Sequence, residues 1–227
     1  MTSTTVHIFT LRRGAVPRAL ARAAADPWRL RATPGVRFAK VLGTGDGSTF
    51  SLRDTDIRRW ALLVVWAGEP ADPTPVIEGW RRIATEEWRA DLALIHSRGR
   101  WAGREPFGEP AAGDHGEGPV AAITRARLDP RHAKAFWRAV PPVAQDLARQ
   151  PGLRFSIGIG EAPIGLQGTF SVWESAAALV AFAYRGAPHR EVVRRTPEAG
   201  WYAEELFARF TVTRTAGTVR GTDPLEP

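Results

Sequence analysis

Hydrophobic and polar positions first alternate and then take a helical spacing between residues 169 and 185. In TFSVW at 169–173 the apolar positions recur every second residue, which predicts a strand. Ser175 favours a helix start, because its hydroxyl can accept hydrogen bonds from exposed backbone N–H groups. The Ala-rich run at 176–184 favours the helix itself, and Gly186 is placed to end it. This stretch therefore predicts a strand that leads directly into an apolar helix.

A second helix is expected from Pro188, since proline suits the first turn of a helix. His189 follows it, and Val192 and Val193 stand three and four residues further on, so the three side chains share one helix face. The positive end of the helix dipole disfavours an imidazolium here, and a neutral imidazole can bind a metal or a haem iron. The local pattern alone favours a core histidine hydrogen-bonded to backbone, with the ligand role as the alternative.

An internal repeat organises the chain. PGVRFAKVLGTG at 34–45 matches PGLRFSIGIGEA at 151–162, and each copy precedes a strand that ends in tryptophan, Trp66 or Trp173. The pattern predicts an α+β fold of two βαββαβ halves, the ferredoxin-like order, packed sheet on sheet into an α/β-barrel arrangement. The expected strands are at 5–11, 35–43, 60–66, 90–96, 119–127, 152–160, 167–173 and 206–214, and the expected helices at 15–25, 74–86, 131–148, 175–185 and 188–196.

The predicted domain boundaries follow from this repeat. The first ferredoxin-like half is 1–100, and a Gly- and Pro-rich linker without regular structure occupies 101–118. The second half, which carries the expected ligand, is 119–214, and a loose tail is expected at 215–227.

The two faces of the strand at 152–160 differ in side-chain size. The large apolar side chains are expected to pack under helices, and they are Leu153, Phe155, Ile157 and Ile159. The opposite face is nearly empty of side chains, which leaves room for a bulky flat ligand, and it carries Arg154, Ser156, Gly158 and Gly160. The equally weighted alternative is that the two glycines merely allow a bulge.

The absence of cysteine excludes disulfides, thiolate catalysis, iron–sulfur clusters and zinc–thiolate sites. The formal charge is +7, but the arginines are scattered and no nucleic-acid motif is present, so nucleic acid is not expected as a partner. Such a surface could still attract an acidic redox partner or make peripheral contact with a membrane. No signal peptide and no transmembrane run are expected, and the expected location is cytoplasmic.

A second group of candidate residues lies at 92–108. His96 is the best rival to His189 as a ligand, and Arg98, Arg100 and Arg104 could hold an anionic group such as a carboxylate or a haem propionate. The favoured alternative is a solvated loop anchored by neighbouring aromatic residues. Glu204 and Glu205 lack a matching set of metal ligands, and GTGDG at 43–47 is interpreted as a turn rather than a phosphate loop.

Three motifs, in order along the chain, give it a family resemblance. G-R-W-A-G-R-E-P-F at 99–107, F-S-V-W-E-S-x-x-A-L-x-A-F-A-Y-R-x-x-x-H at 170–189 and W-Y-x-E-E-L-F-A-R-F at 201–210 together resemble the spheroidene monooxygenase family of carotenoid ketolases. The resemblance covers roughly residues 5–212. It implies a haem-dependent oxygenase that introduces oxygen into a hydrophobic molecule, with His189 matching the family's histidine and therefore expected as the axial ligand.

The sequence therefore predicts an oxidoreductase that binds one b-type haem non-covalently in its second half, since the position equivalent to His189 in the first half is Arg82. An apolar small-molecule substrate and an external electron donor such as a ferredoxin are the expected partners. Alternatives are a haem enzyme of natural-product biosynthesis that performs dehydration, N-oxidation or N–N bond formation, a non-catalytic binder of haem or a hydrophobic ligand, and a cofactor-free or flavin-dependent monooxygenase. No distal acid or base stands out. The pocket candidates are His189, Trp173, Gly158, Gly160, Phe182, Arg154 and Trp66.

Overall fold

A computed structural model describes residues 2–46, 54–110, 117–128, 146–147, 149–161, 168–185 and 202–226. The first half of the chain contains β1 (Ser3–Leu11), the short 3-10 helix η1 (Arg13–Ala15), α1 (Val16–Arg31), β2 (Val36–Gly45), β3 (Thr55–Trp66), α2 (Pro75–Arg81) and β4 (Ala84–Gly99). The second half contains β5 (Val120–Leu128), β6 (Leu153–Gly160), β7 (Gly168–Trp173), α4 (Ala176–Arg185) and β8 (Tyr202–Gly217). The helices expected at 131–148 and 188–196 lie outside the described residues, except for 146–147.

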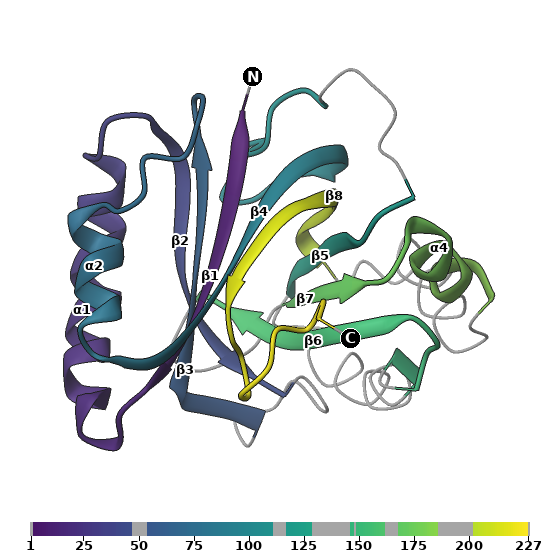
Figure 1. Cartoon of the computed structure of the whole chain (residues 1–227). Coiled ribbons are helices and arrows are strands. Elements are labelled where there is room, and N and C mark those ends of the chain that lie inside the picture. Colours follow the sequence, from purple (N-terminus) through teal and green to yellow (C-terminus); the bar gives the residue numbers. More distant parts are fainter. Residues whose placement is uncertain are drawn as a thin grey trace.

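The strands close into one antiparallel barrel in the order β1-β3-β2-β6-β7-β5-β8-β4 (Figure 1). Within each half the order is the ferredoxin-like one, β2-β3-β1-β4 and β6-β7-β5-β8. The halves meet along β4 and β8, from the Trp88–Gly217 pair to the Gly99–Leu206 pair, and along the shorter β2–β6 contact. The predicted fold class, a duplicated ferredoxin-like α+β chain that forms an α/β barrel, is confirmed. The predicted domain boundaries remain a prediction.

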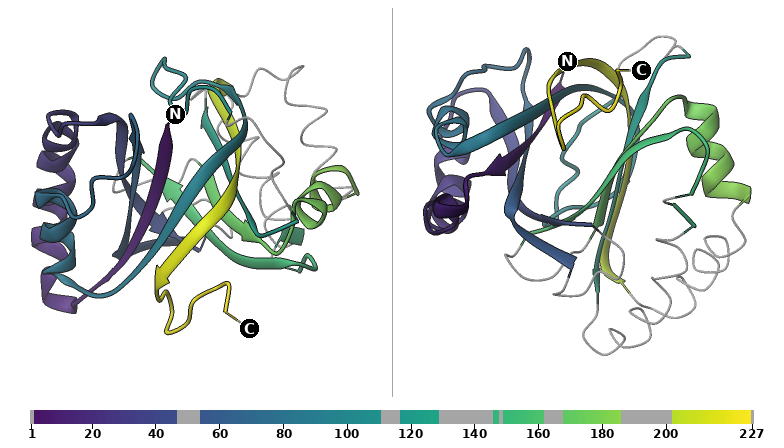
Figure 2. Two further views of the ribbon diagram at one scale, coloured as in Figure 1. Left: turned by 45° about the horizontal axis from the view of Figure 1, so that its top comes forward. Right: turned by 60° about the horizontal axis from the view of Figure 1, so that its bottom comes forward.

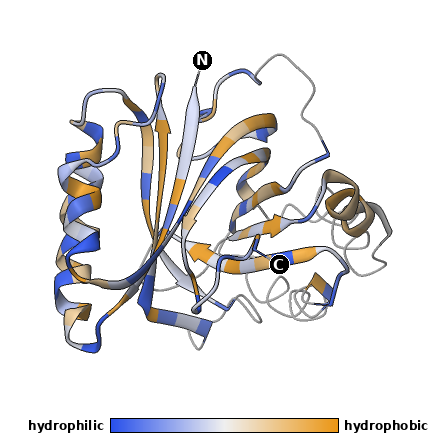
Figure 3. Cartoon of the chain, viewed as in Figure 1, coloured by the Kyte–Doolittle hydropathy of each residue, from blue (hydrophilic) through white to orange (hydrophobic). Residues whose placement is uncertain are grey.

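Helices cover the barrel on two opposite sides (Figure 2). In the first half α1 and α2 cover large outward side chains such as Phe9, Trp60 and Leu62. In the second half α4 covers a smaller apolar cluster that contains Trp173, and its own sequence is apolar over most of its length (Figure 3). No helix in the described part of the chain has the length and hydrophobicity needed to cross a membrane.

Side chains fill the barrel interior, aromatic residues close one end, and aliphatic residues close the other. At one end Phe107 packs edge-on against Phe210, with 4.9 Å between ring centroids, and Trp101 packs beside Phe38. At the other end Val219 and Leu225, from the segment after β8, pack against the interior cluster. Because both ends are closed, the interior is a packed core rather than an open channel.

The structure corrects two of the expected element boundaries. The helix expected at 74–86 ends at Arg81, and β4 begins at Ala84. In β4, alternate residues from Trp88 to Leu94 are buried in the barrel, so tertiary burial overrides the local helix pattern. The last strand, expected at 206–214, extends over Tyr202–Gly217, because both β5 and β4 pair along its length.

The expectation of a loose tail at 215–227 is wrong for the described residues up to 226. The Asp223 carboxylate accepts hydrogen bonds from Trp88 Nε1 at 3.1 Å, from Thr215 Oγ1 at 2.7 Å and from the Leu225 amide at 3.0 Å. Trp88 is fully buried and requires a partner for its indole N–H. The tail is therefore held in place because it supplies that partner.

The face expected for the large side chains of β6 is also wrong. Leu153 does pack towards α4, but Phe155, Ile157 and Ile159 belong to the barrel interior. The cause is a β-bulge: Leu153 pairs with Trp173 and Phe155 pairs with Val172, so two residues of β6 span one step of β7. The extra residue, Arg154, shifts the alternation and turns the apolar face inwards.

We predict that Asp223→Ala lowers the free energy of unfolding by about 1–3 kcal/mol, because the buried Trp88 indole N–H loses its acceptor. Urea denaturation followed by tryptophan fluorescence measures the change. Glu226→Ala is the matched control, since Glu226 is exposed in the same segment. Equal stability of the two variants would contradict the role given to the tail.

Candidate functional site

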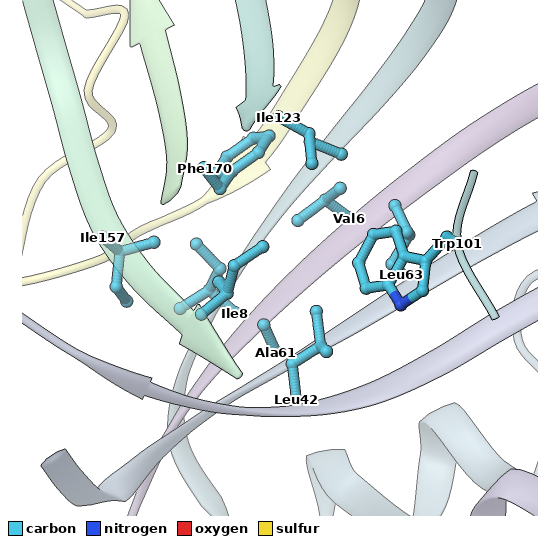
Figure 4. A pocket seen from close by; sticks show the side chains of 10 residues that line it. Val6, Ile8, Leu42, Ala61, Leu63, Trp101, Ile123, Ile157 and Phe170 are labelled. Atoms are coloured by element: carbon cyan, nitrogen blue, oxygen red, sulfur yellow. The ribbon is translucent and has the colours of Figure 1, made fainter. Parts of the chain in front are cut away.

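The barrel interior contains a small apolar cavity (Figure 4). Its lining residues come from strands of both halves and from the segment after β4, and they are Val6, Ile8, Leu42, Ala61, Leu63, Trp101, Ile123, Ile157, Ile159 and Phe170. Apart from Trp101, whose Nε1 already donates to Glu161, these side chains carry no polar atom, so the cavity offers no free hydrogen-bond partner to water or to a polar substrate. It is also far too small for a macrocycle or a long polyene, so a site for a large ligand must lie elsewhere.

A buried ionic network holds Trp101 over this cavity. Arg125 is 4% exposed and donates hydrogen bonds to Glu204 and, at 2.8 Å, to Glu161. Glu161 also accepts from Trp101 Nε1 at 2.5 Å and from Lys40 Nζ at 2.7 Å. The Arg125 guanidinium lies 5.4 Å from the centre of the Trp101 ring, a cation–π geometry. These contacts make Trp101 a fixed cover of the interior.

Both carboxylates of the network have lowered pKa values. Burial alone would raise the pKa of Glu204, but hydrogen bonds from the Gly103 and Ala102 amides and from Arg125 outweigh it. For Glu161, contacts with Lys40, Arg125 and Trp101 outweigh burial in the same way, so its pKa is also lowered. Both carboxylates are therefore ionised at neutral pH, so they can pair with a cation but have no proton to donate.

The outward face of the second-half sheet is lined by small side chains. Ser171 lies directly between Ala122 and Ser156 across three strands, and Thr169 lies between Thr124 and Gly158. All of these point outwards, because their neighbours Ile123, Ile157 and Phe170 point into the barrel. We call Ala122, Ser156, Gly158, Thr169 and Ser171 the small-residue face.

Three of the five equivalent positions of the first half carry larger side chains, whereas Thr5 and Ala39, equivalent to Ala122 and Ser156, are also small. Val64, paired with Thr5 and Ala39, corresponds to Ser171, and Leu62 and Val41 correspond to Thr169 and Gly158. In the first half Leu62 and Val64 are buried beneath α1 and α2. The repeat therefore keeps the fold in both halves but gives the second-half sheet smaller side chains on its outward face, where Ala122 and Ser171 are nevertheless only 8% and 6% exposed.

Aromatic side chains form one edge of the small-residue face. Trp173 and Phe182 stack with 5.4 Å between ring centroids, and Trp173 Nε1 donates to Ser171 Oγ at 3.0 Å. The turn before β6 packs closely against the start of α4: a side chain at Gly152 would come within 3 Å of Glu174 and Ala178. This edge therefore has a fixed geometry.

Basic residues flank the face on strands β8 and β4. Arg209 of β8 pairs with Ala122 on one side and with His96 of β4 on the other. In the next row, Arg98 pairs with Phe207, and its guanidinium lies 4.8 Å from the centre of that ring. Both His96 and Arg98 are exposed. These basic residues could hold the anionic groups of a ligand whose flat body lies on the small-residue face.

The structure brings most of the predicted site residues to one sheet. Trp173, Gly158 and Phe182 belong to the small-residue face or its aromatic edge. Gly160 follows at the end of β6, beside Arg125 and Trp101. Arg154 is an exposed bulge residue whose guanidinium lies 3.6 Å from the Glu174 carboxylate.

Other predicted residues lie apart from this group. Trp66 is buried beneath the first-half helices, where its Nε1 donates to Thr5 Oγ1 at 3.1 Å. Arg100 and Arg104 are exposed in the segment after β4. His189 lies outside the described residues. In the described part of the chain no group of three or more His, Asp or Glu side chains could hold a metal ion.

Sequence reasoning missed the ionic network and a buried histidine. The partners of Arg125 could not be identified locally, because they stand 36 and 79 residues further along the chain. His7 is fully buried, and its Nδ1 lies 2.8 Å from Glu87. The pKa of Glu87 is about 2: burial raises it, but hydrogen bonds from His7 and Arg81 outweigh that effect. A charged residue within an apolar strand is the signal that could have identified Arg125.

The architecture defines a class: a fused pair of ferredoxin-like halves in one barrel. Among solved structures, aldoxime dehydratase has a similar fold, with a TM-score of 0.56 at 11% identity, covering 93% of this chain and 81% of that one. No model of a known protein family matches the chain.

Two curated relatives identify the family. Spheroidene monooxygenase of Rhodobacter capsulatus is 39% identical over 198 residues, which cover 85% of this chain and 82% of the relative. Spheroidene monooxygenase of Rubrivivax gelatinosus is 38% identical over 194 residues, which cover 83% and 73%. The chain belongs to the spheroidene monooxygenase family.

We predict that Arg125→Gln lowers the free energy of unfolding at neutral pH by about 3 kcal/mol, since it leaves two carboxylates without their buried cation. Because the folded-state pKa values of Glu161 and Glu204 are lowered, their contribution is complete at neutral pH and is lost as the pH falls through the acid range. The variant should therefore show a flatter acid dependence in urea denaturation. Arg127→Gln, exposed on the same strand, is the control and should behave as wild type.

Proposed function

We propose that this protein is a haem-dependent monooxygenase that inserts oxygen into an apolar, carotenoid-like molecule. The observation that carries the proposal is the family, whose members R. capsulatus and R. gelatinosus spheroidene monooxygenase are similar to the chain over more than four fifths of its length. The small side chains on the outward face of the second-half sheet support this proposal, because they leave the sheet itself flat.

The described residues are compatible with a haem at this face. A macrocycle needs a flat floor without protruding side chains, and Gly158, Ser171 and Ala122 provide one. Its two carboxylates need cationic partners beside this floor, and Arg98, Arg209 and His96 flank it. Such a haem would be b-type, since the chain has no cysteine for covalent attachment.

His189 is the proposed axial ligand. It follows α4, whose described part ends at Arg185, and α4 packs on the aromatic edge of the small-residue face. The sequence places His189 at a helix start, where the dipole favours the neutral imidazole that an iron requires. The equivalent first-half position is Arg82, which remains protonated and cannot bind iron.

When bound, the haem supplies the binding and activation of dioxygen with electrons from an external donor such as a ferredoxin. The chain's own residues orient and shield the site. Trp173 and Phe182 limit how far a ligand can slide towards α4, and their apolar surface keeps water away from that edge. The Arg98 guanidinium is held over the Phe207 ring, which fixes the position of its charge.

Haem-driven dehydration, N-oxidation and N–N bond formation, flavin chemistry and simple ligand binding are less well supported. The similarity to aldoxime dehydratase, at 11% identity, concerns the fold alone. Both curated relatives are named spheroidene monooxygenase, a name that specifies an oxygenase and a carotenoid substrate. An apolar polyene also agrees with the few polar groups on the small-residue face.

We predict that His189→Ala abolishes the Soret band that develops when the purified protein is titrated with hemin, because iron loses its axial ligand. The melting temperature should remain close to that of wild type. His96→Ala is the comparison: it removes one of the proposed carboxylate partners and not the iron ligand, so the band should remain, at a lower affinity for hemin. A large loss of stability together with an unchanged spectrum would assign His189 to the core instead.

We also predict that Ser156→Phe weakens hemin binding about tenfold or more, since a large side chain on the floor must be displaced or accommodated. Thr85→Phe adds the same bulk at an exposed position of β4 in the first half and should leave binding unchanged. Equal hemin affinity of Ser156→Phe and wild type would rule out the small-residue face as the haem site.

A further inference from the structure

The outermost line of α1 is apolar, which is unusual for the solvent-facing side of a surface helix. Five exposed residues follow this line at spacings of three and four, and they are Pro17, Leu20, Ala21, Ala24 and Trp28. Trp28 is 70% exposed and Leu20 is 44% exposed, and these two are half of the four large hydrophobic residues exposed in the described part of the chain. We call these five residues the α1 stripe.

Arginines flank the α1 stripe without exposed carboxylates. Residues 12–31 contain six arginines, and Arg12, Arg13, Arg18, Arg29 and Arg31 are exposed. The single carboxylate of this segment, Asp26, is fully buried and accepts hydrogen bonds from Arg29 at 2.9 Å and Arg22 at 3.3 Å. The formal charge of the segment is therefore five positive.

The chemistry of this surface fits an anionic lipid bilayer. A helix that lies in a membrane interface has tryptophan and aliphatic side chains on its buried face and basic residues beside them. The Arg31 guanidinium lies 5.2 Å from the centre of the Trp28 ring, so a cation and an amphipathic aromatic ring point to the same surface. Lipid head groups would supply negative charge to Arg12, Arg13, Arg18 and Arg31, because residues 12–31 contain no exposed carboxylate.

We propose that the α1 stripe docks the protein on the surface of a bilayer that contains anionic lipid. A second copy is a poor occupant, since two faces of five positive charges each would repel. The helix stands out on the side of the barrel opposite α4 (Figure 1), so docking through α1 does not involve the small-residue face. Docking would bring the protein to the membrane into which an apolar carotenoid-like substrate partitions. This benefit rests on the proposed function.

The test is sedimentation of the full-length protein with vesicles of phosphatidylcholine that contain phosphatidylglycerol, compared with vesicles of phosphatidylcholine alone. Wild type should bind the anionic vesicles, weakly at high salt, and bind the neutral vesicles much less. Arg18→Gln and Arg31→Gln should each lower the partition coefficient about fivefold. Trp28→Ala should lower it by about the same factor or more.

Ile57→Ala is the control, because Ile57 is 56% exposed at β3 and lies outside the α1 stripe. It should bind like wild type, and all variants should keep the wild-type melting temperature and hemin titration. The proposal is overturned if wild type does not sediment with anionic vesicles, or if Trp28→Ala and the arginine variants bind as well as wild type. It is also overturned if Trp28→Ala instead abolishes a concentration-dependent dimer. Haem binding is measured separately, so its failure would not be confused with failure of docking.

Discussion

Closure of the eight-stranded sheet is the constraint on which the rest of the structure depends. Each half alone would expose the apolar inner face of a four-stranded sheet, and the β4–β8 and β2–β6 pairings bury both faces against each other. The closed interior is then filled by side chains and sealed by Trp101 and Phe107 at one end and Val219 at the other. A large ligand is therefore excluded from the barrel and must use an outer face.

The outward faces of the two half-sheets carry side chains of different size. In the first half, Leu62, Val64 and Trp60 fill the space beneath α1 and α2, and nothing flat could lie there. In the second half, Thr169, Ser171 and Gly158 occupy the matching region, which an aromatic edge and basic residues flank. The two copies thus share one scaffold but differ in side-chain volume on their outer faces.

The repeat and the fold class could be predicted because they depend on local signals, the P-G-x-R-F strands and the strands that end in Trp66 and Trp173. Which side of β6 faces the barrel could not be predicted, because the bulge residue Arg154 reverses the alternation of inward and outward side chains. This bulge can be recognised only from the pairing of β6 with β7. The Arg125 network is non-local in the same way, because three strands must meet before the charge is neutralised. The small side chains around Gly158 could be predicted from the sequence. The position of His96 and Arg98 on the same sheet could not, because it depends on the β4–β8 register.

The central claim is that one half of a duplicated barrel, and only that half, binds haem. The most direct measurement is the amount of haem iron per chain in purified, hemin-reconstituted protein, determined as the pyridine haemochrome against protein concentration. The account predicts a ratio of one. A ratio near two would mean that the first half also binds haem despite its filled outer face, and a ratio near zero would mean that the small-residue face serves another ligand.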